Sequence, residues 1–411
     1  MAEALRLAGR VPRRPWPNPP VGALVVGSGG EVVGRGGHEG AGTAHAEVVA
    51  LQEAGERARG ATLYCTLEPC NHHGRTPPCT PALIASGVRR VVIGVRDPNP
   101  VAAGGLERLL DAGIEVTLGV CAEEALELVW PFVVTEAFGR PFVWLKTATS
   151  LDGRFAPAER AERRPVYLTG ERARHQVHVL RRWADVVLVG GATLRADAPR
   201  LDGRMVTADD ACPACEPLPA VATSQPQVEG WAGRRHVVFA PRRGGPREND
   251  LTQASLSGRR QAPPPRITSA EAPRGGETGP AAPALSPGTI VVECDACEGG
   301  VDPQSIVEAV ASLGAHALLV EGGPRLAAAF LSAGLVDRWI AYTAPLVLGC
   351  GAGWPGREFG FGMEFSLTRV EACGPDVKAV WDRVPFRSWL ERLTAWPAAA
   401  GAERAASRGG A

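Results

Sequence analysis

Three metal-binding side chains and one carboxylate follow one another in a suggestive order near the N-terminus. His45 and Glu47 form a His-x-Glu pair, Cys70 follows Pro69, and eight residues stand between Cys70 and Cys79. Histidine nitrogen and cysteine thiolate bind zinc, and a catalytic zinc keeps three protein ligands and an open position for water. The set therefore predicts one zinc per chain, held by His45, Cys70 and Cys79.

Glu47 is the candidate catalytic residue of this site. Zinc lowers the pKa of a bound water from about 15.7 to roughly 7, and a neighbouring carboxylate can take its proton and return it to a leaving ammonia. Zinc deaminases combine a His/Cys/Cys site with a glutamate that binds no metal, usually followed by Pro-Cys-x-x-Cys. The sequence therefore predicts a hydrolytic deaminase of a small nucleobase-like substrate, with an enlarged loop between the cysteines. A structural zinc would need a fourth ligand, and a non-catalytic zinc scaffold would not need Glu47.

The surrounding patterns predict helix starts at these ligands. His45 opens the helical pattern of residues 44–60, which ends at Gly60. Cys79 directly precedes a shorter helix, for which Thr80 is the expected N-cap and Pro81 the first helical residue. A helix N-terminus lowers the pKa of a thiol and so favours the thiolate that a metal needs.

Strand-like and helix-like segments alternate along most of the chain. This alternation is typical of layered α/β domains, and 411 residues suit two of them. We expect a first domain over residues 1–138 and a second over residues 139–388. Residues 206–287 are rich in Pro, Gly, Ala and Arg and predict a long, partly disordered insert with one strand, at RRHVVFAP. Residues 389–411 predict a disordered tail.

The composition argues against several classes of protein. The 44 Lys and Arg residues balance 44 Asp and Glu residues, so the chain lacks the basic footprint of nucleic-acid or anionic-membrane binding. No apolar stretch is long enough for a signal peptide or a membrane span. Ten cysteines are few for a disulfide scaffold and indicate thiols or metal ligands. We therefore expect a small-molecule substrate and a cytoplasmic location.

Two strand–Gly-Gly–helix junctions stand out in the second half. Gly190-Gly191 follow DVVLV, and Gly322-Gly323 follow ALLVE, with Pro324 opening the next helix. Glycines let a phosphate approach the backbone N–H groups of a helix N-terminus. No G-x-G-x-x-G fingerprint accompanies them. The two junctions favour a phosphate-bearing cofactor over a pair of plain tight turns.

The motifs NPPVG, HAEV, TLEPCNHHGRTPPC and DPNP together resemble the bifunctional deaminase–reductases of riboflavin biosynthesis. KTATSLDGR, GGATLRADAPRL and VEGGPRLAAAFLSAGLVD resemble the reductase half of that family. The resemblance implies an N-terminal cytidine-deaminase-like three-layer domain and a C-terminal dihydrofolate-reductase-like domain. It also implies deamination of 2,5-diamino-6-(5-phosphoribosylamino)pyrimidinone, NADPH-dependent reduction of the ribosyl group to ribityl, and a homo-oligomer.

The resemblance also implies roles for single residues. In the first domain, Asn18 and His38 would hold the pyrimidine and its ribosyl arm, and Arg75 with His73 would meet the phosphate. In the second domain it implies NADPH contacts at Ala148, Tyr167, Thr193, Asp197, Gly323, Pro324, Arg325, Leu326, Ala327, Ala328 and Ala329. It implies reductase-substrate contacts at Pro165, Arg181, Leu201, Arg204 and Glu321.

Some positions depart from the family pattern. Pro165 stands where a serine usually contacts the substrate, and Ala240-Pro241 replace an Asp-Ser pair near the cofactor. The alternative reading is therefore a deaminase of a related pyrimidine ribotide whose reductase half is degenerate or retargeted.

Two Cys-x-x-Cys pairs flank the expected insert, at Cys212/Cys215 and Cys294/Cys297. Four thiolates of this form can bind a structural zinc, although the gap between the pairs is far longer than in ordinary zinc modules. A second metal site is therefore a minor hypothesis.

Overall fold

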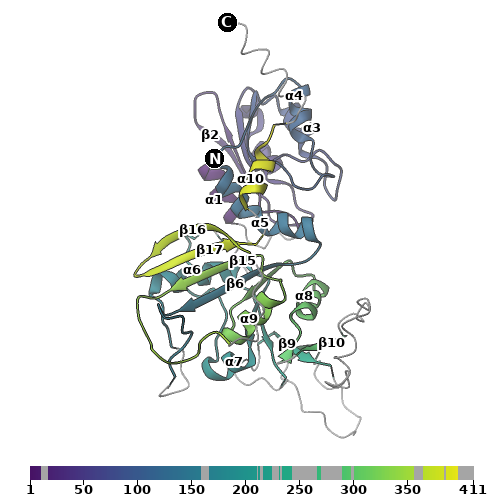
Figure 1. Ribbon diagram of the computed structural model, residues 1–411. Coiled ribbons are helices and arrows are strands. Elements are labelled where there is room, and N and C mark those ends of the chain that lie inside the picture. The colour runs from purple at the N-terminus through teal and green to yellow at the C-terminus, as the bar shows by residue number, and fades with distance from the viewer. Residues whose placement is uncertain are drawn as a thin grey trace. The chain divides into compact units, whose positions relative to one another are not determined.

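The computed structural model (Figure 1) describes residues 1–10, 17–158, 166–210, 212, 216–224, 231, 234–242, 266–269, 289–297, 300–355, 364–383 and 386–396. The chain divides into two compact units. Unit 1 comprises Met1–Gly139, Thr207–Cys215 and Pro385–Ala411, and unit 2 comprises Arg140–Val206 and Glu216–Val384. No helix among the described residues is long and apolar enough to cross a membrane.

Unit 1 is built on a five-stranded sheet with the order β2-β1-β3-β4-β5. Its strands are β1 (Gly22–Val26), β2 (Val32–Gly37), β3 (Thr62–Leu67), β4 (Arg90–Val95) and β5 (Glu115–Leu118). β1 runs antiparallel to both of its neighbours, whereas β3, β4 and β5 are parallel. The carboxyl ends of the parallel strands therefore share one edge, where ligands bind in α/β sheets.

The helical elements of unit 1 are α1 (Ala2–Gly9), α2 (Ala46–Ala54), the 3-10 turn η1 (Gly55–Ala58), α3 (Cys79–Ser86), α4 (Gly105–Asp111), α5 (Ala122–Phe138) and α10 (Phe386–Thr394). The predicted helix starts at His45 and Cys79 are confirmed in position, with His45 as the N-cap of α2 and Cys79 as the first residue of α3. Thr80 is not the N-cap. It lies inside the first turn, and its hydroxyl donates to Asn71 Oδ1 at 2.9 Å.

Two glycines of β2 let helix α2 pack directly on the sheet. A Cβ at Gly34 would lie 2.1 Å from the carbonyl oxygen of Ala50, and a Cβ at Gly36 would lie 1.9 Å from that of Ala46. Both distances are far below contact, so side chains at these positions would push the helix outward. The glycines thus fix the helix whose first turn carries His45 and Glu47.

Unit 2 is built on a ten-stranded sheet with the order β10-β11-β9-β8-β7-β14-β6-β15-β17-β16. The seven strands from β11 to β15 in this order are mutually parallel, and antiparallel strands complete both edges. The strands are β6 (Phe142–Thr149), β7 (Val186–Gly190), β8 (Leu218–Ala222), β9 (His236–Pro241), β10 (Arg266–Ser269), β11 (Thr289–Cys294), β14 (Ala317–Val320), β15 (Arg338–Thr343), β16 (Ser366–Cys373) and β17 (Asp376–Asp382). A separate two-stranded ribbon pairs β12 (Ala296–Cys297) with β13 (Gly300–Val301).

The helices of unit 2 are α6 (Glu171–Trp183), α7 (Gly191–Asp197), α8 (Pro303–Ser312) and α9 (Pro324–Ser332). Its core is a single apolar cluster that joins the central strands to α8 and α9, with Phe239, Ile306 and Phe330 fully buried. Both units are layered α/β structures, as the sequence predicts.

The structure differs from the sequence-based prediction in two segments. Residues 206–287 contribute three strands rather than one, and β8 and β9 lie inside the ten-stranded sheet. Residues 386–394, placed partly in a disordered tail by the prediction, form α10 and belong to unit 1. The rest of both segments lies largely outside the described residues.

Candidate active sites

His45, Cys70 and Cys79 come together at the carboxyl edge of the unit 1 sheet. His45 Nδ1 lies 3.2 Å from Cys79 Sγ and 3.3 Å from Cys70 Sγ, and the two sulfurs are 3.6 Å apart. These three residues form the one group of metal-ligating side chains found in the part of the chain that the structure describes.

The distances fit a tetrahedral zinc. With bonds of about 2.3 Å to sulfur and about 2.0–2.1 Å to nitrogen, tetrahedral geometry places ligand atoms roughly 3.6–3.8 Å apart. The observed edges are shorter by a few tenths of an ångström, which a small outward movement of the side chains would correct. The donor set of one imidazole and two thiols leaves the fourth position open, as a catalytic zinc requires.

Thr76, which the sequence reasoning missed, contacts one of the predicted metal ligands. Its hydroxyl lies 3.1 Å from His45 Nε2, the ring nitrogen that faces away from the sulfurs. A hydrogen bond on the second nitrogen fixes the orientation of a metal-binding imidazole. The enlarged loop between Cys70 and Cys79 therefore supplies a hydrogen-bonding partner for the His45 ring and also separates the two cysteines.

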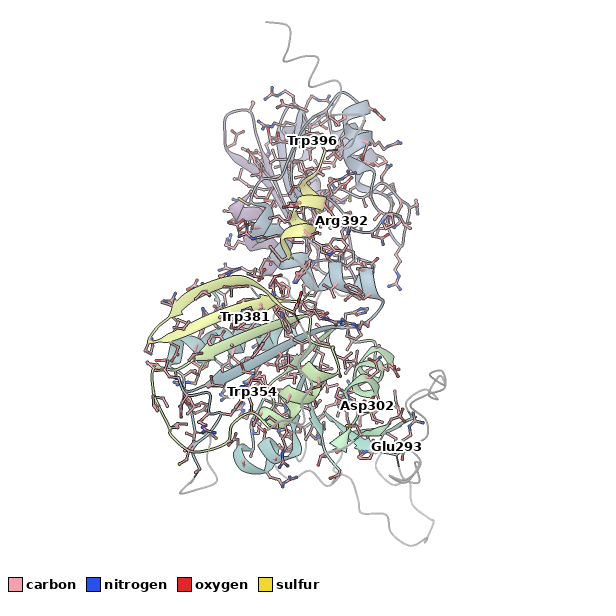
Figure 2. All side chains as sticks on the ribbon, in the orientation of Figure 1. Glu293, Asp302, Trp354, Trp381, Arg392 and Trp396 are labelled. Atoms are coloured by element: carbon pink, nitrogen blue, oxygen red, sulfur yellow. The ribbon has the colours of Figure 1, made fainter. Side chains whose placement is uncertain are left out.

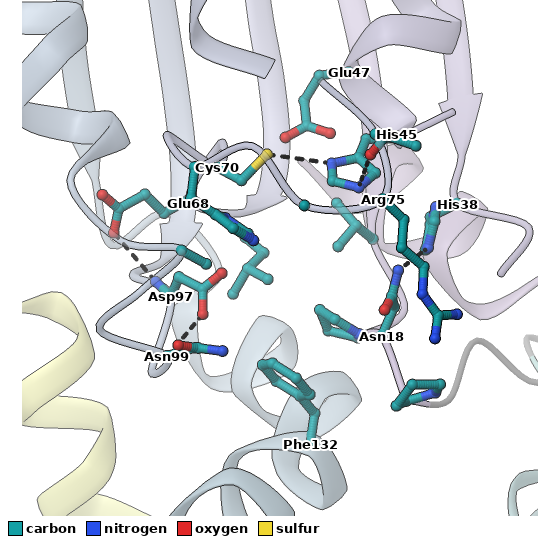
Figure 3. Close-up of a pocket in the computed structure, with 18 of the residues that line it drawn as sticks. Asn18, His38, His45, Glu47, Glu68, Cys70, Arg75, Asp97, Asn99 and Phe132 are labelled. Atoms are coloured by element: carbon teal, nitrogen blue, oxygen red, sulfur yellow. Dashed lines mark hydrogen bonds between the residues drawn. The ribbon is translucent and has the colours of Figure 1, made fainter. Parts of the chain in front are cut away.

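The Glu47 carboxyl is buried beside this cluster, with 3% of the residue exposed. Burial raises the pKa of Glu47 to about 7. A carboxyl whose pKa lies near neutrality can both accept and return a proton at physiological pH. Figure 3 shows Glu47 next to His45 and Cys70.

The hydrogen bond between the two sulfurs favours the thiolate form of Cys70. The hydrogen bond with Cys79, helped by that with His45, lowers the pKa of Cys70 to about 4, whereas the pKa of Cys79 is raised. The hydrogen bond to Cys70 raises the pKa of His45. Cys70 is thus the thiol of this cluster that most readily becomes the thiolate a metal needs.

A cavity of about 380 Å³ opens from the cluster. Asn18, His38 and Arg75 line it, as does His72. His73 is exposed and is not among the lining residues. The Nδ1 atom of His72 is buried and has no hydrogen-bond partner among the described residues.

Asn18 and His38 form a fixed pair in this cavity (Figure 3). Asn18 Nδ2 lies 2.9 Å from His38 Nε2, and His38 Nδ1 lies 3.3 Å from the carbonyl oxygen of Ala44. Burial lowers the pKa of His38, so the ring is neutral at physiological pH. The neutral ring donates to the Ala44 carbonyl through Nδ1 and accepts from Asn18 through Nε2.

A second wall of the cavity consists of acceptors from the end of β4. Asp97 and Asn99 line it, and burial raises the pKa of Asp97 to about 7. One oxygen of Asp97 accepts from Asn99 N at 2.9 Å. The sequence contained these residues in the DPNP motif, but only their position at a strand end signals a binding role.

In unit 2, the two Gly-Gly junctions lie at neighbouring strand ends. β7 and β14 are adjacent and parallel, so Gly190 and Glu321 leave the sheet at the same edge. Gly323 is the N-cap of α9, and a Cβ there would lie 3.5 Å from Thr193 Oγ1 on α7. The starts of α7 and α9 therefore lie close together, and a helix N-terminus presents the backbone N–H groups that bind a phosphate.

Other predicted cofactor residues follow the same edge. Ala148 lies near the end of β6, which is parallel to β14, and Asp197 is the last residue of α7. Residues 324–329 form the first turns of α9. Tyr167 is exposed, and the Arg174 guanidinium lies 5.0 Å from its ring centroid.

Four of the predicted reductase-substrate residues meet around a buried ion pair. Arg181 binds Glu321 through two hydrogen bonds of 2.6 and 2.9 Å and also donates to the carbonyl oxygen of Asp202 at 3.2 Å. Arg204 donates to the Asp202 carboxylate at 2.6 Å. Leu201, the residue before Asp202 in the sequence, is buried. Burial opposes ionisation of Glu321, but the Arg181 guanidinium holds its pKa below the usual value. Pro165 lies outside the described residues.

The hypothesis of a second metal site stays a prediction, because Cys215 lies outside the described residues. Among the described cysteines of the set, Cys294 Sγ contacts the carbonyl oxygen of Ser305 at 3.9 Å.

Two family models match the chain. The RibD C-terminal domain matches residues 141–379, and the cytidine and deoxycytidylate deaminase zinc-binding region matches residues 1–95. The riboflavin biosynthesis protein RibD of Aquifex aeolicus is 39% identical over 352 residues, which cover 85% of this chain and 87% of the relative. The RibD protein of Escherichia coli is 38% identical and covers 92% of this chain and 96% of the relative.

Solved structures show the same likeness. RibD of Acinetobacter baumannii superposes with a TM-score of 0.67 at 31% identity, covering 93% of this chain and 97% of that chain. A diaminohydroxyphosphoribosylaminopyrimidine deaminase/5-amino-6-(5-phosphoribosylamino)uracil reductase of Thermotoga maritima also gives 0.67, at 29% identity and the same coverage.

The metal cluster leads to a first prediction. Cys70→Ala removes one of three ligands, so the zinc content should fall from about one per chain to near zero. Cys65→Ala is the matched control, because Cys65 is also buried but is not part of the metal cluster, and its thiol donates to the carbonyl oxygen of Val92 at 3.7 Å. Elemental analysis of both purified variants decides the assignment. Full zinc occupancy in Cys70→Ala would show that the metal is held elsewhere.

Proposed function

The chain belongs to the RibD family of riboflavin-biosynthesis proteins, and from this membership we propose that it deaminates a diaminopyrimidine ribotide and then reduces its ribosyl group. Unit 1 would carry the deaminase and unit 2 the reductase. The observation that carries the proposal is a buried glutamate with a pKa near 7, beside a three-ligand cluster in the wall of a cavity of about 380 Å³.

In the deaminase site, His45, Cys70 and Cys79 would hold zinc, and zinc, when bound, activates a water molecule. Glu47 takes a proton from that water and returns it to the departing amino group. Burial suits Glu47 to both steps, because it raises the pKa toward that of the groups with which it exchanges protons. Thr76 keeps the imidazole of His45 in place.

The cavity walls suit a pyrimidine that bears a phosphate. Asp97 and Asn99 offer acceptors for ring and amino N–H groups. Asn18 and His38 form a fixed polar pair on the opposite side. We assign the phosphate end to Arg75 and to His72 in place of His73, because His72 lines the cavity with an unpartnered nitrogen.

In the reductase site, NADPH, when bound, supplies the hydride for reduction of the ribosyl group. Gly323 and the first turn of α9 would receive one of its phosphates through backbone N–H groups, with Thr193 beside them. The Arg181–Glu321 pair provides a fixed donor and acceptor surface for the sugar. Lys146 reaches the same region, where burial lowers its pKa and the Glu321 charge opposes that shift.

The alternative of a degenerate or retargeted reductase is not favoured. The reductase family model matches residues 141–379, and RibD proteins match 85% and 92% of the chain. Ala240 and Pro241 end β9, which keeps its place in the parallel sheet.

A homo-oligomer is the further expectation, and one face of unit 2 supports it. Register places Leu367 and Val370 of β16 opposite Trp381 and Ala379 of β17, so these side chains and Val377 share one face of the sheet. Leu367, Val370 and Val377 are 55%, 58% and 48% exposed. β16 is also the last described strand of the sheet order, and an edge strand is where a further strand can pair. A second copy of the chain would cover this apolar face, on which Trp381 lies (Figure 2).

A cytoplasmic location is also part of the proposal, and the state of the cysteines supports it. Cys65, Cys294 and Cys373 are unbridged thiols, and structural thiols of this kind persist in reducing compartments.

Glu47→Gln tests the deaminase assignment. The substitution keeps the side-chain volume and removes the proton acceptor, so deamination should fall by about 10²–10⁴ while zinc stays bound. Reduction of the already deaminated ribotide by the same preparation should stay near the wild-type rate. Both half-reactions are followed by product chromatography. Retained deamination would remove Glu47 from the mechanism.

Asp197→Ala and Glu321→Gln separate the cofactor and substrate roles in unit 2. Asp197→Ala should raise the Kd for NADPH about tenfold, which corresponds to about 1.4 kcal/mol. Glu321→Gln should leave that Kd unchanged and raise the KM for the deaminated ribotide, because it weakens the pair with Arg181. Glu308→Gln, exposed on α8, is the control. Unchanged cofactor affinity and unchanged reduction in both variants would place the site elsewhere.

Val370→Asp tests the proposed interface. A carboxylate in the middle of the apolar face should lower the molecular mass seen by light scattering to that of a single chain. Gln304→Asp, exposed on α8, should leave the mass unchanged. The same mass for wild type and Val370→Asp would rule out this face as the contact.

A further inference from the structure

Helix α10 comes at the end of the chain, after the last strand of unit 2, yet its partners lie in unit 1. It packs against α5 and β4. Phe386 begins the helix and Leu393 lies near its end, and both are buried. On the outer side, the Arg392 guanidinium lies over the ring of Trp389, 4.3 Å from the ring centroid. Figure 2 shows Arg392 on this helix. All of α10 lies outside the residues that the two family models match.

One contact of α10 reaches the strand end that carries the acceptor wall of the cavity. Arg96 N donates to the carbonyl oxygen of Leu393 at 2.8 Å. Arg96 directly precedes Asp97, which lines the cavity. The bond therefore fixes the backbone one residue away from a cavity side chain.

The same strand end is bound from the other side by Glu68, which is buried. Its carboxylate accepts from Asp97 N at 3.2 Å, from Gly104 N at 3.1 Å and from Leu106 N at 2.9 Å. The Arg96 guanidinium lies 3.4 Å from Glu68 and 2.6 Å from Glu107. Residues 96–106 are thus held between the Glu68 carboxylate and the end of α10.

A second contact of α10 reaches the helix that forms another wall. Phe386 packs edge-to-face on Trp130 of α5, with ring centroids 5.2 Å apart. Two residues further along α5, Phe132 lines the cavity, as does Glu136. Figure 3 shows Phe132 facing the same space as Asp97 and Asn99.

We propose that α10 is a positioning element of the deaminase site, which sets the walls formed by Asp97–Asn99 and by α5 through its contacts at Arg96 and Trp130. The chain needs its C-terminal segment for the chemistry of its N-terminal unit. This inference rests on the proposed deaminase function. It implies that the N-terminal residues 1–139 alone make an incomplete deaminase.

The test uses the full-length, zinc-loaded chain. Phe386→Ala/Leu393→Ala removes the buried contacts of α10, and Arg387→Ala/Glu391→Ala, two exposed positions of the same helix, is the matched control. Misplacement of binding groups by about 1 Å lowers rates by up to about 10². We expect kcat/KM for deamination to fall at least tenfold in the first variant, chiefly through a higher KM, and to stay unchanged in the control. Zinc content and reduction of the deaminated ribotide should be unchanged in both.

Two shortened chains extend the test. A chain that ends at residue 384 lacks α10 and should show the same selective loss, whereas a chain that ends at Trp396 should match the wild type. Phe386→Leu, which keeps an apolar contact, should recover most of the lost deamination.

The possible failures are distinguishable. If the wild type does not deaminate the ribotide, the proposed function fails. If the wild type is active and both the double variant and the chain ending at 384 keep wild-type kcat/KM, the role of α10 is refuted. Loss of zinc or of reduction together with deamination would also overturn it, because the helix would then act on overall folding rather than on the cavity walls.

Discussion

A single buried aspartate, Asp337, fixes where the chain enters and leaves unit 2. Its carboxylate accepts two hydrogen bonds from Arg140, at 2.7 and 2.6 Å, and one from Val143 N at 2.9 Å. Its carbonyl oxygen accepts from Arg383 N at 2.9 Å. Arg140 is the first residue of the unit and Arg383 stands next to its last, so the beginning and the end of the chain segment that forms unit 2 meet at one residue. A charge-assisted, bidentate bond in a buried place is among the stronger polar contacts a protein makes, and its loss would leave an unpaired buried charge.

The two units use buried carboxylates in opposite ways. Burial is the main influence on Glu47 and raises its pKa to about 7, which suits it to carry a proton. Glu321 is also buried, but the Arg181 guanidinium holds its pKa below the usual value and keeps it charged. A proton-transfer step needs the first kind of environment, because the group must change its charge during the reaction. Hydride transfer from a cofactor needs fixed positions instead, and an ion pair provides these. The surroundings of each carboxylate, rather than its residue type, separate the two chemistries.

Sequence reasoning reached the metal ligands and the α/β class because both depend on local signals. His45 and Cys79 begin helices, and a helix start is visible in the residues around it. Other features depend on partners far along the chain. The loop of residues 71–76 has no periodicity, so nothing in it indicates that His72 rather than His73 faces the cavity. β8 looks like part of a Pro-rich insert because its stability comes from pairing with β7 and β9 rather than from its own residues. The acceptor wall at Asp97 likewise depends on the order of the strands, which no short pattern reveals.

The convergence on Asp337 explains how a helix from the end of the chain can serve unit 1. Without a folded unit 2, bringing residue 386 back to α5 would require closing a flexible loop of more than two hundred residues, which is entropically unfavourable. The folded sheet removes that flexibility, because Arg383 is already fixed beside the residue that holds Arg140. In the sequence, only residues 384 and 385 stand between Arg383, which is fixed in unit 2, and Phe386, which begins α10. At the other end of unit 2, Arg140 directly follows Gly139, the last residue of the first segment of unit 1. Docking of α10 therefore needs little additional ordering of the chain. The fold of unit 2 thus lowers the entropic cost of joining α10 to unit 1, because the chain is already fixed at Arg140 and at Arg383.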